Sequence, residues 1–238
     1  LGASGLSMAR FLHARGESVV ATDIDAGRTN AQRELDTLGI ETQIGFHDQT
    51  TFDNAACLVP SPGIPLTSSY IADAIEKGVS VTGELDIFSQ YNRLPVIAVT
   101  GTNGKTTTTT LIGELLSACG MHPFVGGNIG TPLVEQLMSD VEHDIIVAEV
   151  SSFQLDISAH FRPDVGLLLN ISEDHLDRYD DFASYEKSKW GLFANQTSKN
   201  IAVINAGINA FDQRLTALKS KILTFASSGS KSGTPGAY

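Results

Sequence analysis

The chain has 238 residues, a length that allows one large domain or two of ordinary size. Charged residues make up 18% and hydrophobic residues 42%, which is enough apolar material for sizeable cores and excludes a disordered chain. The formal net charge of -11 disfavours nonspecific binding to nucleic acids or anionic membranes, but it leaves room for a local basic site. No apolar run approaches the roughly 20 residues that a membrane helix needs.

Both ends of the sequence have features that predict a longer parent chain. Residue 1 is Leu, and the glycine-rich turn at residues 1–5 has no strand before it. The stretch 227–236 is rich in Ser and Gly, a composition typical of flexible tails and loops. We therefore expect this chain to be an internal portion of a longer protein.

Short apolar runs rich in Val and Ile alternate with longer amphipathic stretches along the chain. The runs predict strands at 18–23, 56–60, 96–100, 144–150, 165–170 and 201–205. Several runs are continuously apolar, which favours strands covered on both faces and hence a parallel sheet with helical crossovers. Pro95 follows a helix expected at 84–88 and precedes a new strand. The sequence thus predicts an α/β fold with two domains, at 1–93 and 94–238.

The first glycine turn, Gly2-Ala3-Ser4-Gly5, precedes a helical stretch. It matches the last two glycines of G-x-G-x-x-G, which let backbone amides at a helix N-terminus approach a pyrophosphate. Asp23 closes the next strand at the distance expected for an acid that contacts a ribose. Two alternatives stay open at this point: a tight turn without a ligand, and the cofactor site of a nicotinamide-dependent oxidoreductase.

The second glycine turn carries a stronger signal. The run 100–106, Thr-Gly-Thr-Asn-Gly-Lys-Thr, follows an apolar strand and precedes a long helix expected at 106–119. In that context backbone amides and the helix dipole favour phosphates, the Lys105 ammonium neutralises them, and the Thr106 hydroxyl can bind Mg²⁺. The run departs from the common phosphate-loop pattern, because Val99 stands where a glycine is usual. The alternative is an ordinary Gly-Lys turn.

Polar residues follow the strand at 144–150. Glu149 closes it, and in a parallel sheet the carboxyl ends of strands line one crevice, so Glu149 is expected to face the phosphate loop. A carboxylate there suits Mg²⁺ shared with phosphate. Ser151, Ser152 and Gln154 come next, and they could donate to a substrate or cap the following helix.

Three further features complete the candidate site. The run 170–179, Asn-Ile-Ser-Glu-Asp-His-Leu-Asp-Arg-Tyr, ends another buried strand and offers His175 as a metal ligand or hydrogen-bond donor, although a loop histidine by itself more often faces solvent. A third glycine-rich turn at 126–130 presents Asn128. Lys189 lies in a helix expected at 182–193, where the simplest interpretation is a solvated surface lysine.

Taken together, these residues resemble the Mur ligases of bacterial cell-wall synthesis, which are cytoplasmic ATP-dependent enzymes that join amino acids to a UDP-N-acetylmuramoyl carrier. The resemblance covers nearly the whole chain and is carried by six ordered runs: 2–5, 61–64, 100–107, 126–130, 149–154 and 170–179. Asn103, the run 151–154 and the run 173–179 resemble the members that add D-glutamate to UDP-N-acetylmuramoyl-L-alanine. A histidine commonly occupies the Asn103 position in the relatives that add L-alanine.

The resemblance implies a Rossmann-like, UDP-binding domain at 1–93 followed by a P-loop-type, ATP-binding central domain at 94–238. A third domain of the family has no counterpart here, so we expect the isolated chain to be inactive and its full-length parent to be a monomeric enzyme. The family residues implied to bind ATP are Gly101, Thr102, Asn103, Gly104, Lys105, Thr106 and Thr107. Those implied to hold Mg²⁺ are Thr106, Glu149, His175 and a carbamylated Lys189.

The resemblance also implies substrate contacts. Those with the UDP region are Ala3, Ser4, Asp23, Ser61 and Gly63, and those with the muramoyl-peptide end are Ser151, Ser152 and Gln154. Asn128 is implied to lie near the transferring phosphate, with Lys105, His175 and Lys189 as its partners in catalysis. The implied reaction makes an acyl phosphate from ATP and then an amide with D-glutamate. A related ligase or a non-catalytic ATP-binding module remains the alternative.

Overall fold

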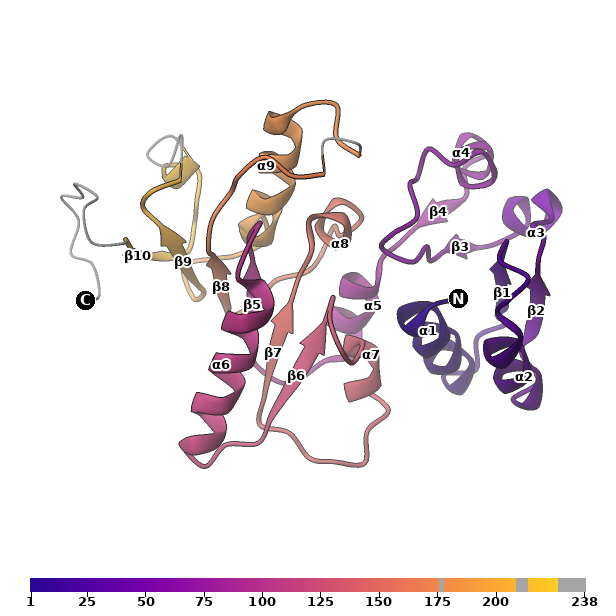
Figure 1. The fold of residues 1–238 in the computed structure, drawn as a ribbon, viewed down its shortest axis with the longest axis horizontal. Helices are drawn as coiled ribbons and strands as arrows, with labels where there is room; N and C mark the ends of the chain where they lie inside the picture. The colour runs from indigo at the N-terminus through magenta and orange to yellow at the C-terminus, as the bar shows by residue number, and fades with distance from the viewer. Residues whose placement is uncertain (176–177, 209–213, 227–238) are drawn as a thin grey trace. The chain divides into compact units, whose positions relative to one another are not determined.

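A computed structural model describes residues 1–175, 178–208 and 214–226. Leu176 and Asp177 of the run expected to form part of the site lie outside the described residues, as does the Ser/Gly-rich stretch 227–236. The chain divides into two compact units (Figure 1). Unit 1 comprises 1–91 and 132–139, and unit 2 comprises 92–131 and the chain from 140 onward.

Unit 1 is built from short parallel strand pairs and helices. β1 pairs with β2 and β3 pairs with β4, both in parallel. The apolar faces of the helices pack in small clusters; in one of them Ala9, Ala21 and Leu35 are buried together. The elements of this unit are α1 (Ala3–Ala14), β1 (Val20–Asp23), α2 (Thr29–Thr37), β2 (Glu41–Ile44), α3 (Gln49–Asp53), β3 (Cys57–Leu58), α4 (Ser69–Glu76), β4 (Ser80–Val81), α5 (Glu84–Tyr91) and α7 (Leu133–Gln136).

The short helix α7 belongs to unit 1, although the chain around it belongs to unit 2. Val134 is fully buried in a cluster with Phe11 of α1 and Ile87 of α5. The Glu84 carboxylate accepts a hydrogen bond from the Leu133 amide at 2.7 Å. Apolar burial and a satisfied helix N-terminus therefore hold α7 against residues far away in the sequence.

Unit 2 is organised around a six-stranded parallel sheet with the order β10-β9-β8-β5-β7-β6. Every residue of β7 is buried, as expected of a continuously apolar strand covered on both faces. The elements of this unit are β5 (Val96–Thr100), α6 (Lys105–Ala118), β6 (Pro123–Gly127), β7 (Ile145–Glu149), α8 (Ser152–Asp156), β8 (Val165–Leu168), α9 (Phe182–Trp190), the 3₁₀ helix η1 (Gly191–Phe193), β9 (Ile201–Asn205) and β10 (Lys221–Phe225).

The α/β class with parallel sheets is confirmed, and the order of strands in unit 2 explains where a site can form. The chain crosses from β5 to the edge strand β6 and returns through β7, and it then reaches β8 on the other side of β5. β5 therefore lies at a topological switch point, the position at which ligands bind in open parallel sheets. Within the described residues, no helix has both the length and the apolar character that crossing a membrane requires.

Candidate functional site

The phosphate loop leaves the carboxyl end of β5 and enters the 14-residue helix α6. Gly104 takes the N-cap position with a φ of +81°, a left-handed conformation that glycine adopts without the steric cost of a side chain. Among the described side chains, none caps this helix end with a hydrogen bond. The first amides of α6 and the positive end of its dipole are thus free to face an anion.

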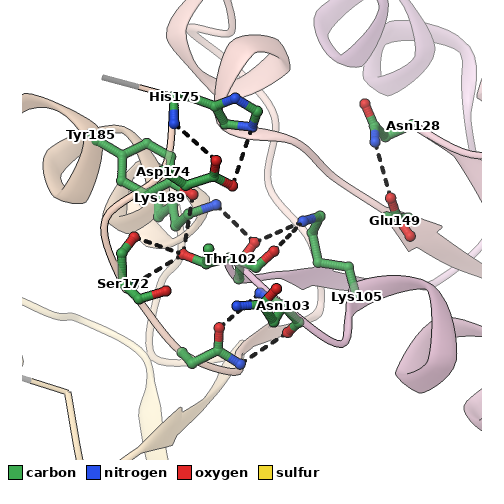
Figure 2. A network of polar contacts seen from close by, with 12 residues as sticks. Thr102, Asn103, Lys105, Asn128, Glu149, Ser172, Asp174, His175, Tyr185 and Lys189 are labelled. Atoms are coloured by element: carbon green, nitrogen blue, oxygen red, sulfur yellow. Dashed lines mark hydrogen bonds and ion pairs between the residues drawn. The ribbon is translucent and has the colours of Figure 1, made fainter. Parts of the chain in front are cut away.

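Two lysines converge on the carbonyl of Gly101 in this loop. Lys105 Nζ donates to the oxygens of Gly101 and Thr102, each at 2.9 Å. Lys189 Nζ on α9 donates to the same Gly101 oxygen at 2.8 Å. Figure 2 shows the two amines reaching the loop backbone from opposite sides. The phosphate loop is therefore flanked by two amines that stand close to each other.

Lys189 is a buried residue, and the expectation of a solvated surface lysine is wrong, because its side chain is only 1% exposed. Its amine lies 4.6 Å from the centre of the Tyr185 ring. Burial, followed by the neighbouring charge of Lys105, lowers the pKa of the Lys189 amine to about 7. A large share of this amine is therefore neutral near physiological pH, which makes it nucleophilic.

The Glu149 carboxylate lies at the end of β7 and is 1% exposed. Its Oε2 accepts from Thr106 Oγ1 at 2.8 Å, and its Oε1 accepts from Asn128 Nδ2 at 2.9 Å. Asn128 also donates its backbone amide to the Glu149 carbonyl at 2.9 Å. The third glycine-rich turn is thereby joined to the end of β7. Three residues expected in the site from separate strand ends are in direct contact.

The approach of this turn to β7 depends on Gly127. A Cβ atom there would lie 2.3 Å from the Glu149 carbonyl oxygen, and φ is +112°. Both facts exclude a side chain at this position without a shift of the backbone. The glycine therefore permits the close packing that brings Asn128 to Glu149.

The oxygens of Thr106 and Glu149 are of the type that Mg²⁺ prefers, and they lie beside the phosphate loop. Across the described part of the chain, no three His, Cys, Asp or Glu side chains gather closely enough to hold a metal ion by themselves. Mg²⁺ usually takes one or two carboxylates from a protein and completes its shell with water and substrate phosphates. The residues present thus fit an ion shared with a nucleotide.

His175 lies on the segment that follows β8. Its φ is +54°, and its ring lies 4.9 Å from that of Phe153 on α8 and 6.0 Å from that of Tyr185 on α9. Its Nε2 lies 3.6 Å from Asp174 Oδ2. A positive φ at a residue other than glycine is uncommon and is found frequently at functional sites. Both His175 and Lys189 therefore border Tyr185.

The polar residues after Glu149 form a helix cap. Ser151 and Gln154 make a reciprocal capping box at the start of α8, with Gln154 N donating to Ser151 Oγ at 3.3 Å and Ser151 N donating to Gln154 Oε1 at 3.0 Å. Ser152 is 2% exposed, and its carbonyl accepts from Ser188 Oγ of α9 at 2.9 Å. The capping role, one of the two alternatives from the sequence, is present, and substrate binding by these three residues stays a prediction.

In unit 1 the first glycine turn meets the run that begins at Ser61. A Cβ atom on Gly5 would lie 3.1 Å from Ser61 Oγ, so the start of α1, with Ala3 and Ser4, lies next to this serine. The Ser61 carbonyl accepts from the Ile64 amide at 2.9 Å and so forms a turn that includes Gly63. Two segments expected to contact one ligand are therefore neighbours in space.

The Asp23 carboxylate, at the end of β1, contacts other polar groups of unit 1. It lies 3.5 Å from Arg28 Nε and accepts from the Asp25 amide at 2.9 Å. The structure gives it Arg28 as a charged partner within unit 1, and its role toward a ribose or uracil stays a prediction.

Sequence reasoning gave no individual role to two residues of the phosphate-loop site. Tyr185 is fully buried, and its hydroxyl lies 3.1 Å from Thr102 Oγ1. Asn170 exchanges two hydrogen bonds with the backbone of Asn103. Asn170 lies at the end of a predicted strand, and that position could have indicated a role in the site. Tyr185 lies within a helix, where a buried aromatic residue has many possible roles.

Comparisons with known proteins identify relatives of both parts of this chain. The model of the Mur ligase middle domain matches residues 99–234, and that of the Mur ligase MurD-like N-terminal domain matches residues 1–83. A relative from Desulfosudis oleivorans named UDP-N-acetylmuramoylalanine–D-glutamate ligase is 46% identical over 227 residues, which cover 94% of this chain and 50% of the relative. One of the same name from Pelotomaculum thermopropionicum is 42% identical over 228 residues, with coverages of 94% and 50%.

Solved structures show the same fold at lower sequence identity. UDP-N-acetylmuramate:L-alanyl-gamma-D-glutamyl-meso-diaminopimelate ligase from Neisseria meningitides matches with a TM-score of 0.63 and 20% identity, covering 94% of this chain and 75% of that one. The chain spans about half the length of the curated relatives named above. With one family model matched over more than half of its length and a second over most of the remainder, the chain belongs to the Mur ligase family.

Proposed function

We propose that the full-length protein carrying this chain is an ATP-dependent ligase of peptidoglycan precursor synthesis, which adds D-glutamate to UDP-N-acetylmuramoyl-L-alanine. The observation that carries the proposal is the joining of the phosphate loop to a buried carboxylate, with Thr106 Oγ1 donating to Glu149 at 2.8 Å beside an uncapped helix end. The choice of D-glutamate is supported by relatives of that name at 46% and 42% identity.

In this proposal the chain's own residues carry the first step by positioning and charge neutralisation. A carboxylate oxygen of the alanyl carrier attacks the γ-phosphorus of ATP, and ADP leaves. Lys105 and the first amides of α6 bind the phosphates, because both lie at the same helix end. Asn128 has its side-chain amide beside Glu149, where it can donate to the phosphoryl group in transfer.

The second step forms the amide. The amine of D-glutamate attacks the acyl carbon, loses a proton, and inorganic phosphate leaves with one oxygen from the original carboxylate. Thr106 and Glu149 would hold one Mg²⁺, and His175 with a carbamylated Lys189 would serve a second. Bound Mg²⁺ supplies neutralisation of the charge that develops on the phosphoryl oxygens.

Carbamylation of Lys189 is chemically reasonable in this setting. The reaction with CO₂ requires a neutral amine, and the pKa of Lys189 is lowered to about 7, chiefly by burial. The product is a carboxylate-like group with two hard oxygens, which an unmodified ammonium lacks. This step turns a buried cation, which repels metal ions, into a metal ligand.

The other expected contacts belong to the same proposal. The UDP part would be bound by Ala3, Ser4, Asp23, Ser61 and Gly63, and the muramoyl-peptide end by Ser151, Ser152 and Gln154. The two-domain division at residue 93 rests on the sequence pattern around Pro95, and the monomeric state and the cytoplasmic location rest on the family resemblance.

The test is amino-acid and carrier selectivity in the full-length protein. Purified protein with ATP and Mg²⁺ is offered UDP-N-acetylmuramoyl-L-alanine with D-glutamate, L-glutamate or L-alanine, and UDP-N-acetylmuramate with the same amino acids. We expect one amide product, from the alanyl carrier and D-glutamate. Amide formation from UDP-N-acetylmuramate and L-alanine would assign the protein to another branch of the family, and ATP turnover without any amide would favour a non-catalytic nucleotide-binding module.

A further inference from the structure

The chain that follows β8 runs beside the phosphate loop after both strands have ended. Leu169 N donates to the Thr100 carbonyl at 3.0 Å, and Thr102 N donates to the Asn170 carbonyl at 3.0 Å. These bonds continue the parallel pairing of β5 with β8 past the last ladder position, Thr100 with Leu168. The first part of the phosphate loop is thus held as a strand-like extension of the sheet.

The side chain of Asn170 extends this pairing by one more position. Its Oδ1 accepts from the Asn103 amide at 2.8 Å, and its Nδ2 donates to the Asn103 carbonyl at 2.9 Å. The carboxamide has the same donor and acceptor as a peptide group, so it pairs with Asn103 as a neighbouring strand would. In Figure 2 the two dashed lines at the backbone of Asn103 mark these bonds. The backbone polar groups of Asn103 are therefore satisfied by one side chain.

The close approach of the two segments also accounts for Gly101. A Cβ atom at that position would lie 3.1 Å from Leu169 Cβ and 3.4 Å from Asn170 N. The contact with Leu169 would be tighter than ordinary van der Waals packing and would push the loop away from the segment after β8.

A second contact joins the same two segments. Thr102 Oγ1 donates to the Ser172 carbonyl at 3.2 Å and accepts from the Ser172 amide at 3.1 Å. Ser172 lies three residues before His175 in the chain. The segment that positions the phosphate loop is therefore the one that carries His175.

These contacts restrict which amides can bind phosphate. The amides of Thr102 and Asn103 already have acceptors, in the carbonyl and side-chain oxygens of Asn170. We infer that Asn170 is a positioning residue, which fixes the Asn103 peptide so that the first amides of α6 face the nucleotide, and which couples the phosphate loop to the His175 segment. The inference rests on the proposed function, because it assumes that the loop binds a nucleotide phosphate. Coupling between the two segments is reciprocal, so a nucleotide on the loop should order the His175 segment.

The test compares Asn170→Ala with Asn205→Ala in the full-length protein, with MgADP as the probe. Asn205 is the matched control, because its Nδ2 donates at 2.8 Å to Leu169 O on the same segment but no described contact joins it to the phosphate loop. The dissociation constant of ADP is measured by calorimetry, and hydrogen exchange of residues 169–175 is measured with and without ADP. A second variant, Asn170→Asp, keeps the size and the acceptor for the Asn103 amide, so it carries the test if Asn170→Ala does not fold.

We expect Asn170→Ala to weaken ADP binding about tenfold or more, a factor that corresponds to about 1.4 kcal/mol, while Asn205→Ala stays within about twofold of the wild type. The loss of ADP affinity in Asn170→Asp should be at least as large, because a carboxylate oxygen then faces the Asn103 carbonyl and the negative charge faces the phosphates. ADP should protect residues 169–175 from exchange in the wild type and in Asn205→Ala, and should fail to do so in Asn170→Ala. Affinity for the UDP-linked carrier should be unchanged.

Wild-type ADP affinity in a folded Asn170 variant would overturn the inference and leave the proposed function intact. Equal losses of affinity for ADP and for the UDP-linked carrier would also overturn it, because they would indicate general destabilisation. No binding of ADP by the wild type would overturn the proposed function itself, and this inference with it.

Discussion

The amine of Lys189 donates a hydrogen bond to the carbonyl of Gly101 at 2.8 Å, across 88 residues of sequence. This contact places a helix that follows β8 against the phosphate loop that follows β5. Lys105, which is half-buried, donates to the same oxygen, so the buried amine of Lys189 has a second amine close to it. The consequences of this arrangement can be measured in the full-length protein.

The first prediction concerns Lys105. Lys105→Ala should reduce amide formation by about a hundredfold to a thousandfold, since loss of one key electrostatic donor costs about 2.7–4 kcal/mol of transition-state stabilisation. Lys187→Ala, on an exposed residue of α9, is the control for loss of one positive charge. The measurement is steady-state turnover, with circular dichroism to verify folding. Near-normal turnover by a folded Lys105→Ala protein would exclude its role in binding phosphate.

The second prediction concerns the pH dependence of stability. The pKa of Lys189 is about 7 in the folded state and near its ordinary value of 10.5 in the unfolded state. Between these values the unfolded chain binds more protons, so the free energy of unfolding should rise with pH, by at most about 1.4 kcal/mol per unit. Below pH 7 the cost of burying the ammonium is present in full.

Lys189→Met should remove this pH dependence and should stabilise the protein at pH 7 in buffer stripped of CO₂. Lys187→Met should leave both the slope and the stability as in the wild type. Denaturant unfolding at several pH values from 7 to 9 provides the measurement. An unchanged slope in Lys189→Met would mean that Lys189 is not the residue that titrates.

The third prediction concerns carbamylation. Lys189→Ala should abolish amide formation, and a short-chain carboxylate added in solution should partly restore it by supplying the lost oxygens. Stripping CO₂ at mildly acidic pH should lower wild-type activity, because the amine is then mostly protonated and the carbamate is not replaced. Lys187→Ala should respond to neither treatment. Full activity of Lys189→Ala without added acid would contradict the proposed metal-binding role.

The fourth prediction concerns Glu149. Glu149→Gln keeps the side-chain size but removes the charge and one of the two acceptors that Thr106 and Asn128 use. Dependence of nucleotide binding on Mg²⁺ should be lost, while Glu142→Gln, on an exposed residue, should keep it. Titration of ADP with and without Mg²⁺ checks this. An equal Mg²⁺ effect in Glu149→Gln and wild type would remove Glu149 from the metal site.

The fifth prediction concerns Gly127. Gly127→Ala should destabilise unit 2, because the new Cβ meets the Glu149 carbonyl and the positive φ is strained. Gly120→Ala is the control. Gly120 also has a positive φ, of +84°, but a Cβ atom there would have no neighbour within 4 Å. Gly120→Ala should cost about 1–2 kcal/mol from strain alone, and Gly127→Ala distinctly more. Equal losses in thermal unfolding would show that the clash with Glu149 is relieved at no cost.

Sequence patterns located the sheet of unit 2 and the phosphate loop because both signals are local. The apolar runs at 96–100 and 201–205 correspond to β5 and β9, and the glycine-lysine turn lies between strand and helix as expected. β10 was not predicted, since it lies at the edge of the sheet and exposes part of its length, so its sequence lacks a continuous apolar run.

Contacts between segments that lie far apart in the sequence could not be predicted. The sequence favours a surface position for Lys189, because nothing in the sequence of α9 indicates which face of this helix packs against the phosphate loop. The pairing of Asn170 with the Asn103 backbone depends on β8 lying next to β5, which only the strand order supplies. The packing of α7 in unit 1 has the same origin, in a cluster with Met8 and Phe11, which lie more than a hundred positions away in the sequence.

The most direct test of the proposed reaction follows an oxygen atom. UDP-N-acetylmuramoyl-L-alanine labelled with ¹⁸O in its terminal carboxylate is incubated with the full-length protein, ATP, Mg²⁺ and D-glutamate, and the released inorganic phosphate is analysed by mass spectrometry. Attack of the carboxylate on the γ-phosphorus transfers one labelled oxygen to phosphate, so each amide formed should release one labelled phosphate. Amide formation with unlabelled phosphate would contradict the acyl-phosphate route, and labelled phosphate without amide would contradict ligation to D-glutamate.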